Sequence, residues 1–393
     1  MAVLFSYAFR PLFLLCVLYA LVAVPLWVFA WVGWIPLPLV FSSNPIWWHA
    51  HEMVFGFAGA AVGGFLLTAV ATWTKRAPVA GGPLLALSLL WLNARLFLFL
   101  PSGPGSNWLV PAAASADLGY DVLLLALMTR EVVASRNQRN YKVLVLLGLF
   151  ACANAAFYAG IGGRPSWVDP ALLGGLWVVV LLIALIGGRV VPAFTGNWLR
   201  RQGAGGSGPP SFDRLDLAAT VVLVVFAVLT LLPVPPIIVG FIGLLSGTLL
   251  LARLSRWRGL RARKEPFVFI LHVGFLWVPI GVLLMAGSAL GGWPASAGIH
   301  ALSVGAIATM IVAIAGRAAL GHTGRPLHGH PALTAAYVFI TVAAVSRVLV
   351  IVAPDARAML LVSGASWFAG FSCFAWRYVP ILLQASVAPG GAL

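Results

Sequence analysis

The chain has 393 residues, of which 62% are hydrophobic and only 8% are charged. So few polar side chains cannot cover a water-soluble protein, which excludes a soluble globular fold. The formal net charge of +15 is typical of nucleic-acid binders, but the basic residues lie in short loops between long apolar runs. That distribution orients helices in a membrane and argues against a nucleic-acid partner. The composition therefore predicts an all-α, polytopic membrane helical bundle surrounded by lipid.

The apolar runs are long enough for about twelve membrane-spanning helices, because one crossing needs about 20 apolar residues. The predicted spans are residues 12–34, 47–72, 83–100, 108–128, 142–161, 168–189, 215–232, 235–255, 266–290, 296–319, 332–353 and 358–380. The first run is too long for the core of a signal peptide and no small-residue cleavage site follows it, so we expect it to be retained. Prolines at 233–236 separate the seventh and eighth spans.

The charges of the loops give an orientation to this series of spans. With the N-terminus in the cytoplasm, all but four of the 24 Lys and Arg residues fall in or beside cytoplasmic loops. The pattern predicts that both termini are cytoplasmic. The Gly/Ser/Pro-rich stretch 200–214 is predicted to be a flexible cytoplasmic linker. It would join spans 1–6 (about 12–189) to spans 7–12 (about 215–380) within a single integral membrane domain, 1–393.

Two histidines and a glutamate open the second predicted span. Because residues two apart on a helix point about 200° apart, His49 and His51 are expected to serve sites on opposite sides of it. Glu52 falls on the side of His49, and both belong to a stripe of residues that continues with glycines. The stripe consists of His49, Glu52, Gly56, Gly59 and Gly63. Its glycines fit either close packing of a neighbouring helix or space for a flat macrocycle.

Polar residues of several spans are predicted to lie in one layer of the membrane, its outer half. Counting the rise along each span places them in the outer half of the bilayer, where we infer an interior site. They are His49, His51, Glu52, Arg95, Asp117, Asn154, His300 and Arg347. Asp121 and His272 lie deeper. An intramembrane histidine such as His272 is a metal ligand, a proton relay or a neutral hydrogen-bonded residue.

The two arginines inside spans need anionic partners. Arg95 is first expected to pair with Asp117, because either charge alone would be costly in hydrocarbon. Alternatively, Arg95 or Arg347 holds a carboxylate of a bound cofactor, such as a haem propionate. The chain has no Walker A motif, no H-E-x-x-H motif and no C-x-x-C-H motif, so any redox or metal cofactor would be held by histidines and not covalently.

At this point several runs of the chain are similar to the NnrS family. The matching runs are Phe9–Pro11, Trp48–Phe57, Phe65–Val70, Arg189–Asn197, His300–Ala306 and Gly321–Leu327. The resemblance implies a protein of the bacterial inner membrane that contains haem, of non-covalent b type, and copper. It also implies a link to denitrification and to tolerance of nitric oxide, the expected small-molecule ligand. By this resemblance His49, His51 and His300 match the family's histidine motifs, and His272 and His322 are weaker candidates.

Three functions follow from these observations. The first is a haem or haem–copper membrane protein of nitrosative stress, with a redox or nitric-oxide-handling activity. The second is a twelve-span secondary transporter with an intramembrane polar binding site. For either function, Glu52, Asp117, Asp121 and Asn154 are expected to give polar support to the intramembrane site. The third is a membrane scaffold or sensor, against which the intramembrane charges argue. The outer-leaflet depth of the histidines favours the first function over the second.

Overall fold

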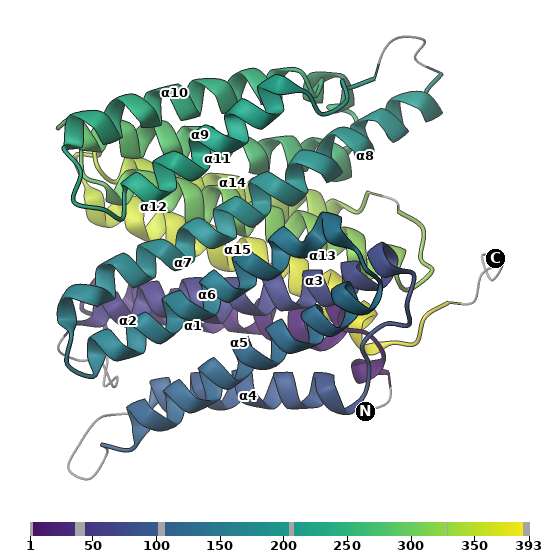
Figure 1. The fold of residues 1–393 in the computed structure, drawn as a ribbon, viewed down its shortest axis with the longest axis horizontal. Helices are drawn as coiled ribbons and strands as arrows, with labels where there is room; N and C mark the ends of the chain where they lie inside the picture. Colours follow the sequence, from purple (N-terminus) through teal and green to yellow (C-terminus); the bar gives the residue numbers. More distant parts are fainter. Residues whose placement is uncertain (1–2, 36–43, 101–106, 204–207, 328, 388–393) are drawn as a thin grey trace. The chain divides into compact units, whose positions relative to one another are not determined.

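The computed structural model describes residues 3–35, 44–100, 107–203, 208–327 and 329–387. Throughout these residues the regular secondary structure is helical, which confirms the predicted all-α class (Figure 1). The chain divides into two compact units. The first comprises Met1–Val178, Ile314–Leu327 and Phe374–Leu393, and the second Val179–Ala313 and His328–Cys373.

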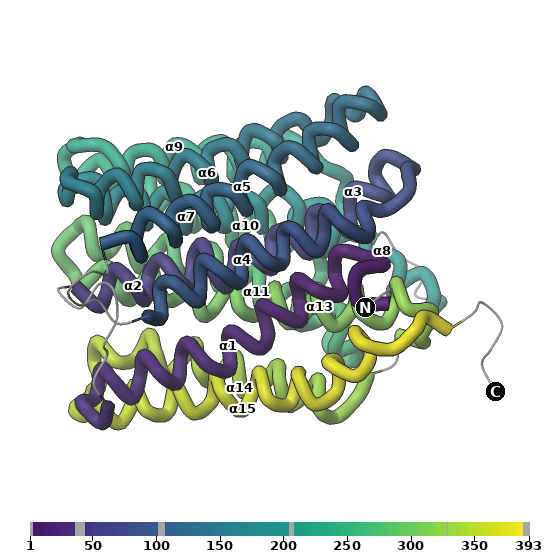
Figure 2. Tube along the Cα trace, turned by 90° about the horizontal axis from the view of Figure 1, so that it is seen from below, coloured from purple at the N-terminus to yellow at the C-terminus, as the bar shows by residue number. Residues whose placement is uncertain are grey.

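The first unit is built mainly from the N-terminal half of the chain. Its helices are η1 (Leu4–Ser6), α1 (Phe9–Trp31), α2 (Pro45–His51), η2 (Glu52–Ala58), α3 (Gly59–Thr74), α4 (Gly82–Phe99), α5 (Leu109–Ala134), η3 (Gln138–Asn140), α6 (Tyr141–Ile161), η4 (Pro165–Trp167) and most of α7 (Val168–Leu182). Within it α1 packs on α3, and α5 packs on both α4 and α6 (Figure 2). The spans α1 to α6 thereby surround a common interior.

The second unit is built mainly from the C-terminal half of the chain. Its helices are η5 (Ile183–Gly187), α8 (Gly188–Arg201), α9 (Arg214–Leu229), α10 (Pro236–Ser255), η6 (Gly259–Ala262), α11 (Pro266–Ala289), α12 (Ser296–His300), η7 (Ala301–Ala308) and α14 (Pro331–Leu349). Two further helices, α13 (Thr309–Gly321) and α15 (Ala356–Leu383), contribute residues to both units. Successive helices α9, α10 and α11 are neighbours, and η7 packs on α11 and α14.

The number of long apolar helices differs by one from the prediction. Among the described residues, eleven helices are long and apolar enough to cross a membrane. The predicted span 215–232 corresponds to α9, which has 16 residues and ends before Pro233. At 1.5 Å per residue it is about 24 Å long, shorter than the roughly 30 Å hydrocarbon core. Pro233 is the reason, since it lies four residues after Leu229 and has no N–H to donate to the carbonyl of that residue.

Contacts at the chain ends nevertheless favour twelve crossings. Arg10, at the start of α1, donates hydrogen bonds to the backbone carbonyls of Leu382 (2.7 Å) and Gln384 (2.6 Å) at the end of α15. The beginning of the first span and the end of the last therefore lie at the same end of the first unit. This requires an even number of crossings, so we count α9 as a short twelfth span.

Three spans contain a π-helical segment in the part of the chain that the structure describes: η2, η5 and η7. Two of them directly follow the histidine motifs, because η2 begins after His51 and η7 begins after His300. A π-helical turn holds an extra residue, and such segments frequently occur at functional sites. They also shift the helical phase, which sequence spacing alone does not reveal.

The division between the units does not coincide with the predicted linker. It falls between Val178 and Val179, inside α7, and the helical segment that begins at Pro165 continues to Arg201. The sixth span is thus longer at its end than the predicted 168–189. Residues 204–207 of the glycine-rich stretch lie outside the described residues.

Candidate functional site

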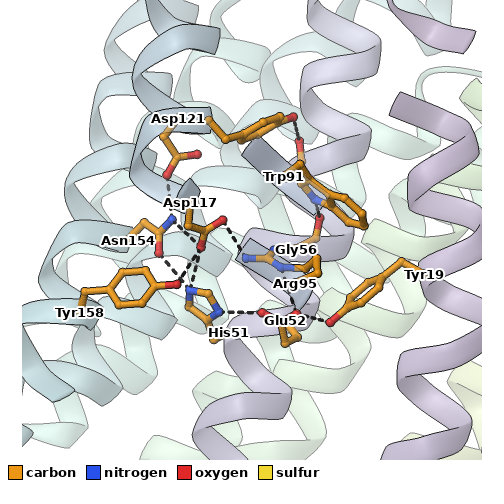
Figure 3. A network of polar contacts seen from close by, with 12 residues as sticks. Tyr19, His51, Glu52, Gly56, Trp91, Arg95, Asp117, Asp121, Asn154 and Tyr158 are labelled. Carbon is orange, nitrogen blue, oxygen red and sulfur yellow. Dashed lines mark hydrogen bonds and ion pairs between the residues drawn. The ribbon is translucent and has the colours of Figure 1, made fainter. Parts of the chain in front are cut away.

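A buried polar network occupies the interior of the first unit (Figure 3). Its side chains come from α1, the α2–η2 junction, α4, α5 and α6. They are Tyr19, His51, Glu52, Arg95, Asp117, Asp121, Asn154 and Tyr158. Each of them is at most 7% exposed. The sequence placed His51, Glu52, Arg95, Asp117 and Asn154 in one half of the bilayer, and the structure brings these five together.

Arg95 joins two carboxylates at the centre of this network. Its Nη2 lies 2.7 Å from Asp117 Oδ1, and its Nε lies 3.1 Å from Glu52 Oε2. The guanidinium also lies over the ring of Trp91, 5.7 Å from its centroid. The predicted Arg95–Asp117 pair is therefore present, and Glu52 is a second anionic partner that the sequence argument did not assign. Tyr19 donates a further hydrogen bond to Glu52 Oε2.

Both ring nitrogens of His51 are engaged by oxygen atoms of the network. Nδ1 lies 3.0 Å from Glu52 Oε1, while Nε2 lies 3.0 Å from Asn154 Oδ1 and 3.2 Å from Asp117 Oδ2. The ring also stacks on Phe157, with centroids 4.2 Å apart. A metal ligand needs a nitrogen lone pair aimed at the metal. In this arrangement neither nitrogen of His51 offers one, so His51 is a hydrogen-bonding residue of the network.

Asn154 links two aspartates of α5. Asp117 and Asp121 are four residues apart and therefore project from the same face of that helix. The Asn154 Nδ2 amide donates to Asp117 Oδ2 at 3.2 Å and to Asp121 Oδ2 at 2.8 Å. Tyr158, one turn after Asn154 on α6, donates to Asp117 Oδ2 at 3.2 Å. Asp117 thus receives several donors, whereas Asp121 shares the amide.

Gly56 in η2 is what allows Arg95 to lie against the backbone of the second span. A Cβ atom at this position would lie 2.5 Å from Arg95 Nη1. The carbonyl of Gly56 also accepts a hydrogen bond of 2.9 Å from Trp91 Nε1. The glycine is therefore required by close approach of a side chain, which corresponds to the packing interpretation of the sequence.

The glycine stripe predicted for the second span does not stay on one face. Gly56 and Gly63 face Arg95 and Tyr120, respectively, but Gly59 faces the ring of Phe150 on α6. The extra residue of η2 explains the change, because it rotates the residues that follow it relative to a regular α-helix. Protein side chains fill the space beside Gly56 and Gly63, so the stripe leaves no room there for a flat macrocycle.

His49 lies on the other side of the second span from His51, as predicted. Its ring is half-buried and stacks on Trp27 of α1, with centroids 4.5 Å apart and an interplanar angle of 8°. The short stretch Trp48–Glu52, where α2 meets η2, thus carries His49 as well as two residues of the network, His51 and Glu52.

The remaining predicted site residues belong to the second unit. His300 Nδ1 lies 2.7 Å from the carbonyl of Ser296, one turn earlier on α12. His272 Nε2 lies 2.8 Å from Thr195 Oγ1, a residue of the α8 motif that the sequence argument did not connect with it. Arg347 is half-buried in the last turn of α14. No pairwise contact among these three residues is described.

The second unit also contains a buried ion pair that the sequence argument missed. Arg253 of α10 lies 2.7 Å from Asp216 Oδ1 of α9, and its guanidinium approaches Gly188 where η5 ends. The spacing Asp213-x-x-Asp216 at a helix start, opposite Arg253-x-x-Arg256, was a usable signal. The structure shows that Asp213 and Asp216 form a capping box for α9.

The hydrogen-bond partners of each histidine indicate which of its ring nitrogens could bind haem iron or another metal. Among the described residues, no group of three or more His, Cys, Asp or Glu side chains is placed to hold a metal ion. In His300 the carbonyl of Ser296 only accepts, so Nδ1 carries the proton, and Nε2 is the nitrogen that a neutral ring would offer to a metal. His272 donates from Nε2, since the Thr195 hydroxyl proton is used on the carbonyl of Val191.

The sequence argument missed the tyrosines of the network. Tyr19 and Tyr158 were not distinguished from the many aromatic residues of the chain, although Tyr158 stands one turn from Asn154 on a helix face. For Tyr19 no local signal exists, because its partner Glu52 is 33 residues away.

The comparisons with known proteins agree with the resemblance noted in the sequence. The family model described as NnrS protein matches residues 3–386, nearly the whole chain. The searches of curated proteins and of solved structures gave no match.

Proposed function

The chain belongs to the NnrS family, and on that premise we propose that it is a haem-containing membrane protein of the nitric-oxide response. The family match over residues 3–386 is the observation that carries this proposal. The proposed setting is the inner membrane of a denitrifying bacterium under nitrosative stress. Copper is proposed as a further metal.

The histidines provide structural support for haem. His49 and His300 are each proposed as a residue that would hold haem iron, and each lies in a span that continues into a π-helical segment. His300 has the tautomer that an iron ligand needs, fixed by the Ser296 carbonyl. When bound, a haem iron held by histidine supplies a coordination position for a small ligand such as nitric oxide. Nitric oxide is small and apolar, so the lipid itself is a route to such a position.

The two arginines differ in what they can offer a haem propionate. Arg95 is fully buried and already paired with Asp117 and Glu52, so it is committed to the network. Arg347 is half-buried near the end of its span, which makes it the better candidate for a propionate. The proposal therefore assigns Arg95 to the protein interior and Arg347 to the cofactor.

A visible spectrum of the detergent-purified protein tests the proposal. We expect a Soret band that His49→Ala and His300→Ala each reduce strongly while the protein still inserts. His330→Ala is the matched control, because the His330 side chain caps the start of α14 and is not a candidate ligand; this change should leave the band unchanged. A purified parent protein without a Soret band after haem reconstitution would contradict the proposal.

A secondary transporter is the second candidate, and the buried network in the first unit is the observation that favours it. If the spectra show no haem, proteoliposomes should then accumulate a solute in a manner that Arg95→Leu abolishes.

Metal analysis of the same preparation tests copper, with about one copper per protein expected.

A further inference from the structure

Two carboxylates of α5 have very unequal surroundings although they share one amide. Asp117 has Arg95 Nη2 at 2.7 Å, His51 Nε2 at 3.2 Å and the hydroxyl of Tyr158 at 3.2 Å. Asp121 is equally buried, at 5% exposed, but its described polar contact is the amide of Asn154 at 2.8 Å. Every cationic side chain that the structure describes in the network contacts Asp117 or Glu52.

Charge counting shows that an ionised Asp121 would be in excess. Arg95 supplies one positive charge, and His51 supplies a second if both its nitrogens donate to the facing oxygens. Glu52 and Asp117 balance these two charges, so the network is neutral without Asp121. If His51 were neutral, the negative excess would only be larger. An ionised Asp121 is therefore in excess whether His51 is protonated or neutral.

The other groups around the network do not change this balance. Those that face it are Tyr19 and Cys16 of α1, His51 and Glu52 of the second span, Arg95 of α4, Asp117, Tyr120 and Asp121 of α5, and Tyr158 of α6. The tyrosines and the cysteine are neutral near pH 7. A third negative charge in this low-dielectric interior is costly, and a carboxyl group avoids that cost by keeping its proton.

We propose that Asp121 is a proton-binding site, a buried carboxylic acid that takes up and releases one proton while Asp117 stays ionised against Arg95. The ligand is the proton itself, and the transfer breaks or forms only the O–H bond of the Asp121 carboxyl group. Asp121 lies at the end of the network opposite Tyr19 and Glu52 (Figure 3). Proton exchange there would change the net charge of the interior without disrupting the central ion pairs. The proposal does not depend on haem.

Infrared spectroscopy of the detergent-purified full chain tests it directly. We expect the carbonyl stretch of one protonated carboxylic acid near neutral pH, shifted to lower wavenumber in heavy water. The band should disappear as the pH rises, with release of one proton per protein. Asp121→Asn should remove it, and Asp169→Asn, which changes an exposed aspartate of α7, should not. If the Asn variant does not fold, Asp121→Glu should move the band instead.

Three results would overturn the proposal. One is the absence of an acid band in the parent protein near neutral pH. Another is a band that survives in Asp121→Asn or stays unmoved in Asp121→Glu, since the proton would then belong to another group. The third is a band that neither shifts in heavy water nor titrates at alkaline pH, because a sealed acid would be a purely structural residue.

Discussion

Arg95 is the residue on which the buried network of the first unit depends. It is 2% exposed and is the described guanidinium that reaches both Asp117 and Glu52. Charges this deep are stable only in combination, because each one loses its hydration and regains it only from its partners. Loss of one partner therefore has a larger effect than loss of a surface ion pair, which contributes about 0–1 kcal/mol.

Asp117→Asn should destabilise the protein by about 3–5 kcal/mol, since it leaves Arg95 with one of its two carboxylates. Thermal melting in detergent measures this, with Asp169→Asn as the exposed control. The double variant Arg95→Leu/Asp117→Leu should recover only part of the loss, because Glu52 and His51 then lose partners as well. Melting of Asp117→Asn at the temperature of the parent protein would show that the ion pair does not hold the network together.

At the scale of helices, α4 packs against the π-helical segment η2 because Gly56 lets Arg95 approach the backbone closely. Gly56→Ala should destabilise the protein by about 1–3 kcal/mol, because its Cβ would displace Arg95 Nη1, 2.5 Å away. Gly148→Ala on α6 is the matched control: nothing lies within 4 Å of its Cβ position. There the change should be neutral or stabilising by up to about 1 kcal/mol. Equal melting temperatures for the two variants would mean that Arg95 can move without cost.

The start of α9 should respond to acid. Hydrogen bonds donated by Arg256 hold the pKa of the exposed Asp213 carboxyl group below its usual range. A carboxylate with a lowered folded pKa stabilises the protein above its unfolded pKa of about 4, and the contribution is lost as the pH falls through the folded value. Arg256→Gln should therefore lower the melting temperature at neutral pH, and its difference from the parent protein should shrink as the pH falls below about 4. A difference that stays the same from neutral to acid pH would refute this assignment.

At the scale of the whole molecule, the even number of crossings and the basic loops together predict the topology. Both chain ends meet at one end of the first unit through Arg10, and we predict that this end is cytoplasmic. A cysteine at Arg164 should then react with a membrane-impermeant maleimide added to intact cells, and one at Arg261 should not. The parent protein, which contains three cysteines, provides the background. Labelling of Arg261→Cys but not of Arg164→Cys would mean that the orientation is the opposite of the predicted one.

Much of this protein was determined by its sequence alone. Apolar runs of about 20 residues between basic loops are a local property, and they gave the helical class and the order of the spans. That Arg95, Asp117, Asn154, His51 and Glu52 lie in one layer was also predictable, because a helix rises by a constant 1.5 Å per residue. The expectation that Arg95 pairs with Asp117 followed from depth and from the cost of an isolated charge.

Only the tertiary structure decided which side chains meet. Glu52 was assigned to the side of His49, yet it contacts His51, Arg95 and Tyr19, and Gly59 turns toward α6. For Gly59 the physical reason is the π-helical segment η2, whose extra residue changes the rotation per residue that sequence spacing assumes. Glu52 begins that segment beside His51, and its other partners come from α1 and α4. The partners of His272 and Tyr19 were likewise hidden, because contacts between helices depend on their rotation and spacing, which no local pattern encodes.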